Sequence, residues 1–272
     1  MSMKQTLKRI VPPSAWNAAR SLNDSIRRLP ELPAAYLHPW RRESIGRLAA
    51  FKDIHQGRRA FIIGNGPSLK QTDLSKLRDE ITFGMNRFYV AFPELGFQTT
   101  YFASINDLVI EQFVEDISAL TMPKFLSWRS RRFFNDKTYN DTTNFIYTSY
   151  TGPKFSPDVR GRVWEGATVT TVALQIAFHM GFDQVVLIGV DHNFASKGDA
   201  NKTVTSDGDD PNHFMPNYFG KGVRWQLPDL DTSEIGYIMA REAYKKAGRQ
   251  VVDATVGGKL TVFPKVEYNS LF

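Results

Sequence analysis

The sequence contains no cysteine, which excludes a disulfide, a zinc–thiolate site and a thiol nucleophile. It also lacks any apolar run that approaches the roughly 18–20 residues needed to span a bilayer, so an integral membrane protein is excluded. A secretory signal is not expected, because Pro12 and Pro13 stand where such a peptide would place its apolar run. These absences favour a cytoplasmic protein.

Disorder is excluded by what the chain does contain. Of its 272 residues, 42% are hydrophobic and 23% are charged, and the aromatic residues comprise 20 Phe, 10 Tyr and 5 Trp. This is enough apolar material for a sizeable core. The length suits one large α/β domain with an appendage, or at most two small domains.

The net charge of +6 is unevenly distributed along the chain. Residues 1–60 hold 12 Lys and Arg against 4 Asp and Glu, a net of +8, whereas the remaining 212 residues carry a net of −2. A basic arm on a near-neutral body is not typical of a protein whose main face binds nucleic acid. We therefore expect no nucleic-acid partner.

Residues 1–57 form this basic helical arm. Ser14 can cap a first helix, whose apolar positions recur at helical spacing: Trp16, Ala19, Leu22, Ile26 and Leu29. Its other faces carry Arg20, Arg27 and Arg28. A second helix before Gly57 has the apolar positions Ile45, Leu48, Phe51 and Ile54.

Two interpretations of the helix over residues 14–29 stay open. Its arginines and apolar stripe suit an anionic membrane surface, which would make the protein peripheral on the inner face of the membrane. Alternatively, the helix packs on the body or on a second subunit of a homo-oligomer.

From residue 58 to the C-terminus, short apolar runs alternate with helical patterns. The expected strands cover residues 59–64, 81–85, 100–103, 124–126, 144–147, 184–188 and 250–253. The expected helices cover residues 73–77, 108–120, 168–180 and 233–247. This alternation predicts an α/β domain over residues 58–272 with a Rossmann-like, doubly wound, mainly parallel sheet. Residues 195–232 have no periodicity, which predicts a lid or binding segment.

The strand ends supply the candidate site, because ligands of open α/β sheets bind outside the carboxyl ends of the strands. The first strand ends in Gly64-Asn65-Gly66-Pro67-Ser68, where glycines allow close backbone approach and Ser68 can cap the next turn. The pattern lacks the third glycine of the dinucleotide fingerprint and the lysine of a P-loop. A nucleotide cradle and a tight structural turn are both compatible with it.

Other strand ends and one helix start carry further polar side chains: Asn86, Asn106, Asp107, Thr168 and Asp191. Amide groups both donate and accept hydrogen bonds, which suits sugar hydroxyls and a base edge. The start of the helix at Thr168 offers its dipole to an anion. Each of these residues alone is equally compatible with a capping or turn role.

Three blocks together resemble a known family. They are Phe61–Leu69 (FIIGNGPSL), Gly84–Tyr89 (GMNRFY) and the stretch from residue 172 to Asp191, in which MetGlyPhe precedes LeuIleGlyValAsp. They resemble the 6-hydroxymethylpterin diphosphokinase-like family and are similar to blocks of the bacterial CMP-sialic acid-dependent sialyltransferases. The resemblance implies a sialyltransferase-like variant of the GT-A fold.

The same resemblance implies an inverting glycosyltransferase that transfers a nucleotide-activated sugar, with a CMP-linked ulosonic acid favoured, to a glycan or lipid-linked acceptor in surface polysaccharide synthesis. This hypothesis requires no cofactor. The alternative is pyrophosphate transfer from ATP to a hydroxymethylpterin, which requires Mg²⁺; Asp107 and Asp191 are its candidate ligands. A third hypothesis is a nucleotide-binding scaffold without catalysis.

By resemblance, the nucleotide and its sugar would be bound by Gly64, Asn65, Gly66, Ser68, Asn86, Asn106 and Thr168. The sialyltransferases place an aromatic hydroxyl shortly after GlyIleAsp to stabilise the leaving phosphate, whereas this chain has His192-Asn193-Phe194. Tyr218, in the lid segment, could supply that role. Lys221 and Arg224 could neutralise a diphosphate or a sugar carboxylate.

The transfer also needs a general base, for which histidine has a suitable pKa. His213 lies in the segment before the last helix, where the sialyltransferases carry their base, so it is the preferred base with His192 as its support. Hydrogen bonding of both histidines to loop backbone is the open alternative.

Overall fold

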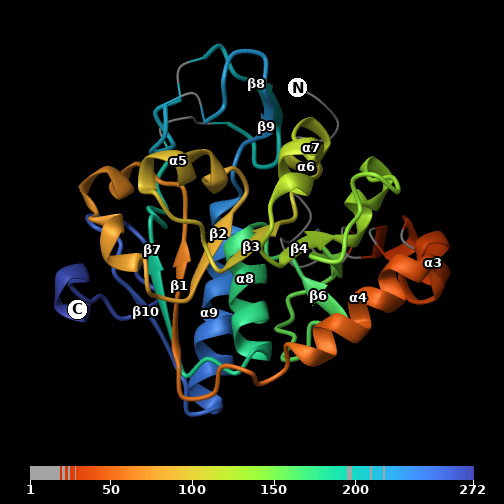
Figure 1. Ribbon diagram of the computed structural model, residues 1–272, viewed down its shortest axis with the longest axis horizontal. Helices are drawn as coiled ribbons and strands as arrows, with labels where there is room; N and C mark the ends of the chain where they lie inside the picture. Colours follow the sequence, from red (N-terminus) through yellow and green to blue (C-terminus); the bar gives the residue numbers. More distant parts are fainter. Residues whose placement is uncertain are drawn as a thin grey trace.

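An eight-stranded sheet forms the centre of the computed structural model, with helices on both of its faces (Figure 1). The structure describes residues 19, 22–23, 25–27, 29–194, 198–208, 210–216 and 218–272. Ser14, Trp16, Arg20 and Arg28 of the first expected helix lie outside these residues. The fragments 22–23 and 25–27 are helical.

The strands of the sheet are β1 (Arg59–Ile63), β2 (Thr82–Met85), β3 (Tyr101–Ser104), β4 (Lys124–Ser127), β5 (Thr143–Ser149), β6 (Arg162–Trp164), β7 (Gln184–Ile188) and β10 (Gln250–Asp253). All seven expected strands are confirmed. Every neighbouring pair in the order β10-β7-β1-β2-β3-β4-β5-β6 is parallel. The predicted Rossmann-like, doubly wound sheet is therefore confirmed. The short β6 was not expected.

The α-helices are α3 (Leu32–Leu37), α4 (Pro39–Ala50), α5 (Phe92–Leu95), α6 (Asp107–Gln112), α7 (Val114–Ala119), α8 (Val169–His179) and α9 (Leu230–Lys246). The 3₁₀ turns are η1 (Leu29–Glu31), η2 (Pro67–Gln71), η3 (Leu74–Leu77), η4 (Phe88–Ala91), η5 (Trp128–Phe133) and η6 (Tyr268–Leu271). The helix expected over residues 73–77 is thus a 3₁₀ turn. The helix expected over residues 108–120 is broken at Phe113, whose φ of −133° is not helical.

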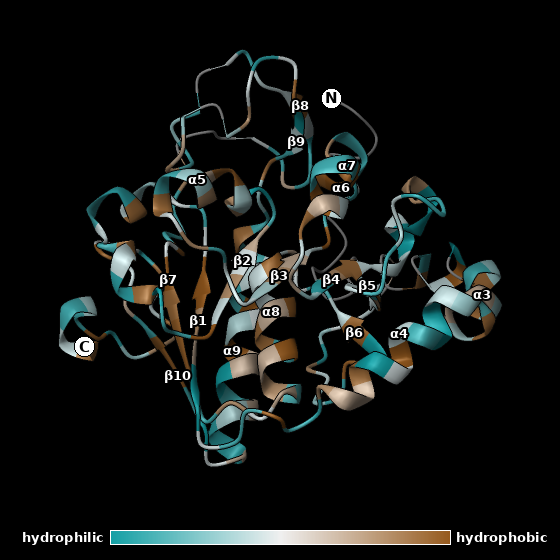
Figure 2. Ribbon diagram, in the orientation of Figure 1, coloured by the Kyte–Doolittle hydropathy of each residue, from teal (hydrophilic) through white to brown (hydrophobic). Residues whose placement is uncertain are grey.

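Alternate residues of each central strand face opposite cores. On β1, Ala60 and Ile62 pack in the cluster covered by α8 and α9, whereas Phe61 and Ile63 pack in the cluster under η2 and η3. Figure 2 shows β1 and β7 as hydrophobic along their length, which fits strands buried on both faces. The period of two places the two helical layers on either side of the sheet.

The order of the strands reverses beside β1. The chain proceeds outward from β1 to β6 and then returns to place β7 on the other side of β1. The chain after β1 continues into η2 and η3 on one face of the sheet, whereas α9, the helix after β7, packs on the other face. In doubly wound sheets, this switch point opens a crevice at the carboxyl ends of the strands.

Helix α4, which the sequence pattern assigned to the arm, packs on the sheet. The Ser44 hydroxyl accepts a hydrogen bond from the Phe145 amide of β5 (2.9 Å), and Arg47 Nε donates to Asn144 Oδ1 (3.0 Å). Leu48 is fully buried in the main core. The apolar spacing of this helix thus reports contact with the body.

The residues before α4 carry an exposed apolar surface, made by Leu22, Ile26, Leu29, Tyr36 and Leu37. The hydroxyls of Ser25 and Thr151 are 3.1 Å apart, which places this segment beside the loop after β5. Within the part of the chain that the structure describes, no helix combines the length and the apolar character needed to cross a membrane.

The predicted lid contains a small fold of its own. Strands β8 (Thr203–Thr205) and β9 (Arg224–Gln226) pair antiparallel and project beyond the carboxyl edge of the sheet (Figure 1). Tyr218, Phe219 and Trp225 pack together with Val109 of α6. The Phe214 amide donates to the Asn65 carbonyl (3.0 Å), which fastens the segment to the loop after β1.

Candidate functional site

A pocket of about 400 Å³ lies between the carboxyl edge of the sheet and the lid segment. The structure brings most of the predicted site residues to its wall: Gly64, Asn65, Gly66, Asn86, Asn106, Asp107, Thr168, Asp191, His192 and His213. Two predicted residues, Ser68 and Tyr218, do not line it. The strand ends therefore form one site, as the topology requires.

The two glycines after β1 make room for the loop after β7. A Cβ atom on Gly64 would overlap the carbonyl oxygen of Gly189, and one on Gly66 would overlap the carboxylate of Asp191. The sequence predicted that Gly66 leaves space for a phosphate. In the structure, the space beside its Cα is filled by a protein carboxylate.

Ser68 and Asp191 are bonded to each other. The Ser68 hydroxyl donates to Asp191 Oδ2 (2.8 Å) and the Ser68 amide donates to Oδ1 (3.2 Å), so Asp191 caps the start of η2. Burial raises the pKa of Asp191, and the two Ser68 hydrogen bonds only partly offset this. Ser68 is buried, and it acts on the pocket through the position of Asp191.

The side chains of the three asparagines each form a hydrogen bond within the protein. Asn65 Nδ2 donates to the Met85 carbonyl (3.0 Å), and Asn86 Oδ1 accepts from the Ser104 hydroxyl (3.0 Å). Asn106 Oδ1 caps α6 by accepting the Leu108 amide (2.9 Å). Asn65 Oδ1 is buried and has no hydrogen-bond partner among the described residues.

Three non-glycine residues on the pocket wall have left-handed backbones, namely Asn86 (φ 53°), Ala167 (φ 56°) and His192 (φ 52°). Such conformations cost free energy, and they concentrate at functional sites. Ala167 and Gly166 (φ 53°) form the turn that leads into α8, closed by the Thr168 amide on the Glu165 carbonyl (3.2 Å). This turn points the first amides of α8 at the pocket.

His213 is paired with a carboxylate that the sequence analysis did not single out. Its Nδ1 atom lies 2.8 Å from both carboxylate oxygens of Asp210. Burial alone would raise the pKa of Asp210, but the hydrogen bond and charge of His213 hold it below its usual value. The Asp-x-x-His spacing was visible in the sequence and is the signal that could have identified Asp210.

Tyr218 supports this pair from beneath and does not offer its hydroxyl to the pocket. Its ring stacks on the His213 imidazole with centroids 4.1 Å apart. The hydroxyl accepts the Arg87 amide (3.1 Å), the Arg87 guanidinium donates to the Tyr218 carbonyl, and burial raises the pKa of the phenol. The geometry therefore does not fit the predicted contact with a leaving phosphate.

His192 also lines the pocket. Its ring meets Tyr237 of α9 edge-on at 5.9 Å, and burial lowers its pKa although Glu234 and Asp231 act in the other direction. Lys221 and Arg224 do not line the pocket. Arg224 pairs with Glu111 on the outside of the lid segment (2.9 Å).

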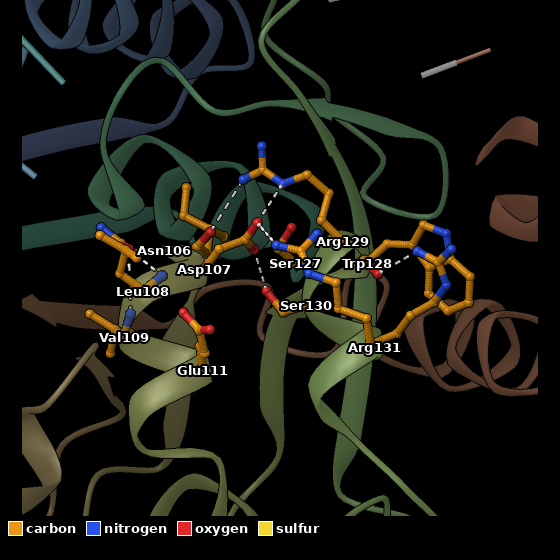
Figure 3. A network of polar contacts seen from close by, with 12 residues as sticks. Asn106, Asp107, Leu108, Val109, Glu111, Ser127, Trp128, Arg129, Ser130 and Arg131 are labelled. Atoms are coloured by element: carbon orange, nitrogen blue, oxygen red, sulfur yellow. Dashed lines mark hydrogen bonds and ion pairs between the residues drawn. The ribbon is translucent and has the colours of Figure 1, made fainter. Parts of the chain in front are cut away.

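Two charged residues beside the predicted Asp107, namely Arg129 and Glu165, were not predicted as site residues from the sequence. Arg129 Nη2 lies 2.9 Å from Glu165 Oε1, and Arg129 Nε lies 3.8 Å from Asp107 Oδ2. Asp107 also accepts the Ser130 hydroxyl (2.7 Å), a contact drawn in Figure 3. The run from Trp128 to Phe133 reads as an exposed basic turn, and only the tertiary fold brings Arg129 to Glu165.

Asp107 and Asp191 do not fit a Mg²⁺ site as they stand. Asp107 is engaged by Ser130 and by the guanidinium of Arg132 (3.0 Å), and Asp191 is engaged by Ser68. Within the described part of the chain, no three His, Asp or Glu side chains are grouped to hold a metal ion.

The doubly wound sheet, with its pocket at the switch point beside β1 and β7, defines an α/β protein of the Rossmann-like class. A family model described as 6-hydroxymethylpterin diphosphokinase MptE-like matches residues 39–197, more than half of the chain. The chain belongs to this family, which confirms the resemblance drawn from its three sequence blocks. The match begins at Pro39, the first residue of α4.

No curated protein matches the sequence. Among solved structures, the MAf glycosyltransferase from Magnetospirillum magneticum AMB-1 is similar at 17% identity with a TM-score of 0.49. The similarity covers 85% of this chain and 39% of that chain.

Proposed function

We propose that the protein is an inverting glycosyltransferase that takes a nucleotide-activated sugar, with a CMP-linked ulosonic acid as its favoured donor, and extends a surface glycan or polysaccharide. One observation carries the proposal. The Asp210–His213 pair belongs to the lid segment, and His213 lines the same pocket as the asparagines at the strand ends. This arrangement combines a proton acceptor with a set of polar groups suited to a sugar nucleotide.

The pair supplies general-base chemistry. With the Asp210 carboxylate accepting the proton on Nδ1, the neutral imidazole keeps its Nε2 lone pair for the acceptor hydroxyl. Nε2 takes the hydroxyl proton as the oxygen attacks the anomeric carbon, and the nucleotide leaves with the bonding electrons from the opposite face. This single displacement inverts the anomeric configuration. Asp210 stabilises the imidazolium that forms.

The donor phosphate would lie at the first turn of α8. Thr168 caps this helix by accepting the Thr170 amide (3.3 Å), and the helix start contributes backbone donors and a positive dipole end. These donors act on the charge that develops on the leaving phosphate. They take over the role that the sequence hypothesis gave to Tyr218.

The charge of the pocket favours one phosphate over three. Among the described residues on its wall, Arg129 is the sole Lys or Arg, whereas four are carboxylic acids: Asp107, Glu165, Asp191 and Asp229. A triphosphate needs several cationic partners or a metal. A CMP-linked sugar presents a single phosphodiester, which backbone amides and one helix dipole can bind.

Mg²⁺-dependent diphosphokinase activity is the second candidate, because the name of the matched family describes it. It would use ATP, with a metal held at the same edge of the sheet. The engagement of Asp107 and Asp191 by other protein groups argues against those two as ligands.

Thermal-shift titration separates the candidates. We expect CMP to raise Tm in the presence of EDTA, since a ligand at 100 times its Kd stabilises the folded state by about 2.7 kcal/mol. The matched variants are His213→Ala, which should keep the CMP shift, and Thr168→Val, which should reduce it. A shift with ATP only when Mg²⁺ is added would favour the diphosphokinase. No shift with CMP, CDP, UDP or ATP would favour the non-catalytic scaffold.

A further inference from the structure

The proposed reaction leaves one wall of the pocket without a role. Arg129, Tyr150 and Glu165 follow β4, β5 and β6, and Asp107 follows β3, so they lie on the half of the sheet edge away from the switch point. Figure 3 shows Arg129 and Asp107 turned toward each other at this edge. If the donor lies between the loops after β1 and β7 and the first turn of α8, this half of the pocket is left for the second substrate.

The cluster is buried and tightly made. The Arg129 side chain is 12% exposed and that of Glu165 is 3% exposed. The Arg129 guanidinium carbon lies 4.9 Å from the centre of the Tyr150 ring, and Tyr150 itself is 49% exposed. Arg129 and Glu165 therefore form a buried floor, and Tyr150 forms a rim that a ligand can reach.

Two atoms of this floor lack hydrogen-bond partners. Arg129 Nε and Glu165 Oε1 are buried and make no hydrogen bond with a described residue, because the 2.9 Å contact of Glu165 Oε1 with Arg129 Nη2 is an ion pair without hydrogen-bond geometry. Buried polar atoms almost always have a partner in the protein, in water or in a ligand. One unfilled donor and one unfilled acceptor thus stand side by side on a pocket wall.

Stability alone does not account for the cluster. Removing two opposite charges from water costs about as much free energy as their attraction returns, so a buried ion pair is weak evidence for a stabilising role. The two guanidinium groups of Arg129 and Arg132 balance the carboxylates of Asp107 and Glu165. The cluster is therefore neutral overall and offers no net attraction to an anion.

The Tyr150 hydroxyl makes side-chain hydrogen bonds with Arg129 and Glu165. The negative charge of Glu165 and burial together raise the pKa of Tyr150 to about 12. The phenol therefore stays protonated at physiological pH. The exposed part of its ring provides an apolar surface beside the charged groups.

We infer that Arg129, Tyr150 and Glu165 form the acceptor subsite and that it takes an uncharged sugar ring. A pyranose hydroxyl can accept from Arg129 while it donates to Glu165, and the C–H face of the ring packs on Tyr150. Because the cluster is neutral overall, it provides no electrostatic attraction that would favour an anionic acceptor over an uncharged one. Its assignment to the acceptor rests on the proposed function, whereas saccharide binding itself can be measured without it.

The experiment uses the nucleotide-free full chain and saturation-transfer NMR with methyl β-galactoside, methyl β-glucoside and methyl β-glucuronide. We expect the neutral glycosides to bind wild-type protein, with affinity falling about tenfold in Tyr150→Ala through loss of the stacking surface. Tyr150→Phe keeps the aromatic ring, so its affinity for the glycosides should fall less than that of Tyr150→Ala. Glu165→Gln should also weaken glycoside binding. If this buried substitution prevents folding, the two Tyr150 variants at the exposed rim still test the inference.

Three results would overturn the inference: equal binding to wild type and Tyr150→Ala, binding of the glucuronide alone, or no glycoside binding at tens of millimolar. CMP affinity is measured on the same samples and should not change in the Tyr150 variants. Glycoside binding without CMP binding would remove the proposed function but keep the saccharide subsite. CMP binding without glycoside binding would remove the subsite alone.

Discussion

The imidazole of His213 is held between two partners, with Asp210 2.8 Å from its Nδ1 atom and the ring of Tyr218 stacked 4.1 Å beneath it. Both contacts fix the plane of the ring. Asp210 is almost fully buried, with 5% of its side chain exposed, so the orientation does not depend on a surface contact. An imidazole fixed in this way keeps one nitrogen free for the pocket, and it is the basis of the first prediction.

Replacing the base should affect turnover and spare donor binding. We expect His213→Ala to lower kcat by about 10²–10⁴-fold, the usual contribution of general-base catalysis, with CMP affinity unchanged. The acidic limb of the pH–rate profile should disappear in this variant, because a protonated imidazole cannot act as base. Steady-state kinetics with a CMP-linked sugar check this.

His192→Ala is the matched control, since it removes the second imidazole of the pocket. It should affect donor binding or stability more than kcat. Full activity of His213→Ala together with an inactive His192→Ala would mean that the two roles are reversed. Activity in both variants would exclude histidine chemistry.

The Asp210–His213 pair should also stabilise the fold in a pH-dependent way. The folded-state pKa of Asp210 is below its unfolded value of about 3.9, so the contribution is present above roughly pH 4 and is lost as the pH falls through the folded pKa. We expect the stability difference between wild type and Asp210→Asn to shrink below about pH 4. Urea unfolding of both proteins between neutral and acid pH measures it, and a constant difference would contradict the assignment.

The fold should require glycine at position 66 because the Asp191 carboxylate occupies the space that a side chain would need. Its φ of −69° is accessible to alanine, so the cost of Gly66→Ala lies in the overlap of the new Cβ with the Asp191 carboxylate. We expect a loss of about 1–3 kcal/mol in the free energy of unfolding. In an Asp191→Ala background, most of that loss should vanish.

Gly64→Ala provides the contrast for this double-mutant cycle. Its Cβ would meet the backbone of Gly189, which no side-chain change can remove. Its cost should therefore be the same with Asp191 or Ala at position 191. Additive costs for Gly66→Ala and Asp191→Ala would show that the two residues are not in contact.

How much of this site the sequence could predict depends on the range of the interactions involved. A buried parallel strand produces a local run of apolar residues. Strands β1 and β7, and the loops that follow them, were therefore predicted from the sequence. Strand β6 was missed, because three residues beginning with the exposed Arg162 make no pattern. The pairing of Asp210 with His213 could have been predicted from their three-residue spacing in the sequence.

Other features depend on contacts between distant segments. Nothing around Tyr218 reveals that its hydroxyl is taken by the Arg87 amide, 131 positions away in the chain. The burial of Arg129 against Glu165 is likewise a tertiary property. Of the charged residues in this half of the pocket, only Asp107 was therefore predicted from the sequence.

A buried lysine far from the pocket should make stability rise with pH. Lys124 on β4 is fully buried among neutral acceptors such as the Leu120 carbonyl (2.7 Å), and burial lowers its pKa to about 8. Above that pH the folded state releases a proton that the unfolded chain holds until about pH 10.4, so stability increases with pH in this window. Between pH 7.5 and about pH 10, we expect the free energy of unfolding of wild type to rise on the order of 1–3 kcal/mol relative to that of Lys124→Met. Denaturant unfolding of the pair measures this gain; a constant difference would contradict it.

The exposed apolar surface before α4 should bind anionic vesicles. Leu22, Ile26 and Leu29 are each more than half exposed, and residues 1–60 carry a net charge of +8. We expect co-sedimentation with phosphatidylglycerol vesicles that weakens with salt, because charges are screened over about 8–10 Å at physiological ionic strength. Replacement of the three residues by serine should abolish it.

The matched control for the vesicle experiment replaces Ile235 and Ile238, an exposed apolar pair on α9, by serine. This variant should bind vesicles like wild type. A serine variant of the arm that changes the oligomeric state instead would assign the surface to a second copy of the chain.

Hydrolysis of a CMP-linked ulosonic acid by the enzyme in the presence of EDTA, followed by ¹H NMR, tests the proposed inverting mechanism. Water replaces the acceptor in this reaction, so neither the natural acceptor nor its subsite is needed. We expect wild type to release CMP, His213→Ala to be at least about 10²-fold slower, and the first sugar signal to belong to the anomer opposite to the donor. A product that retains the donor's configuration, or hydrolysis at the same rate in His213→Ala, would contradict the proposed mechanism.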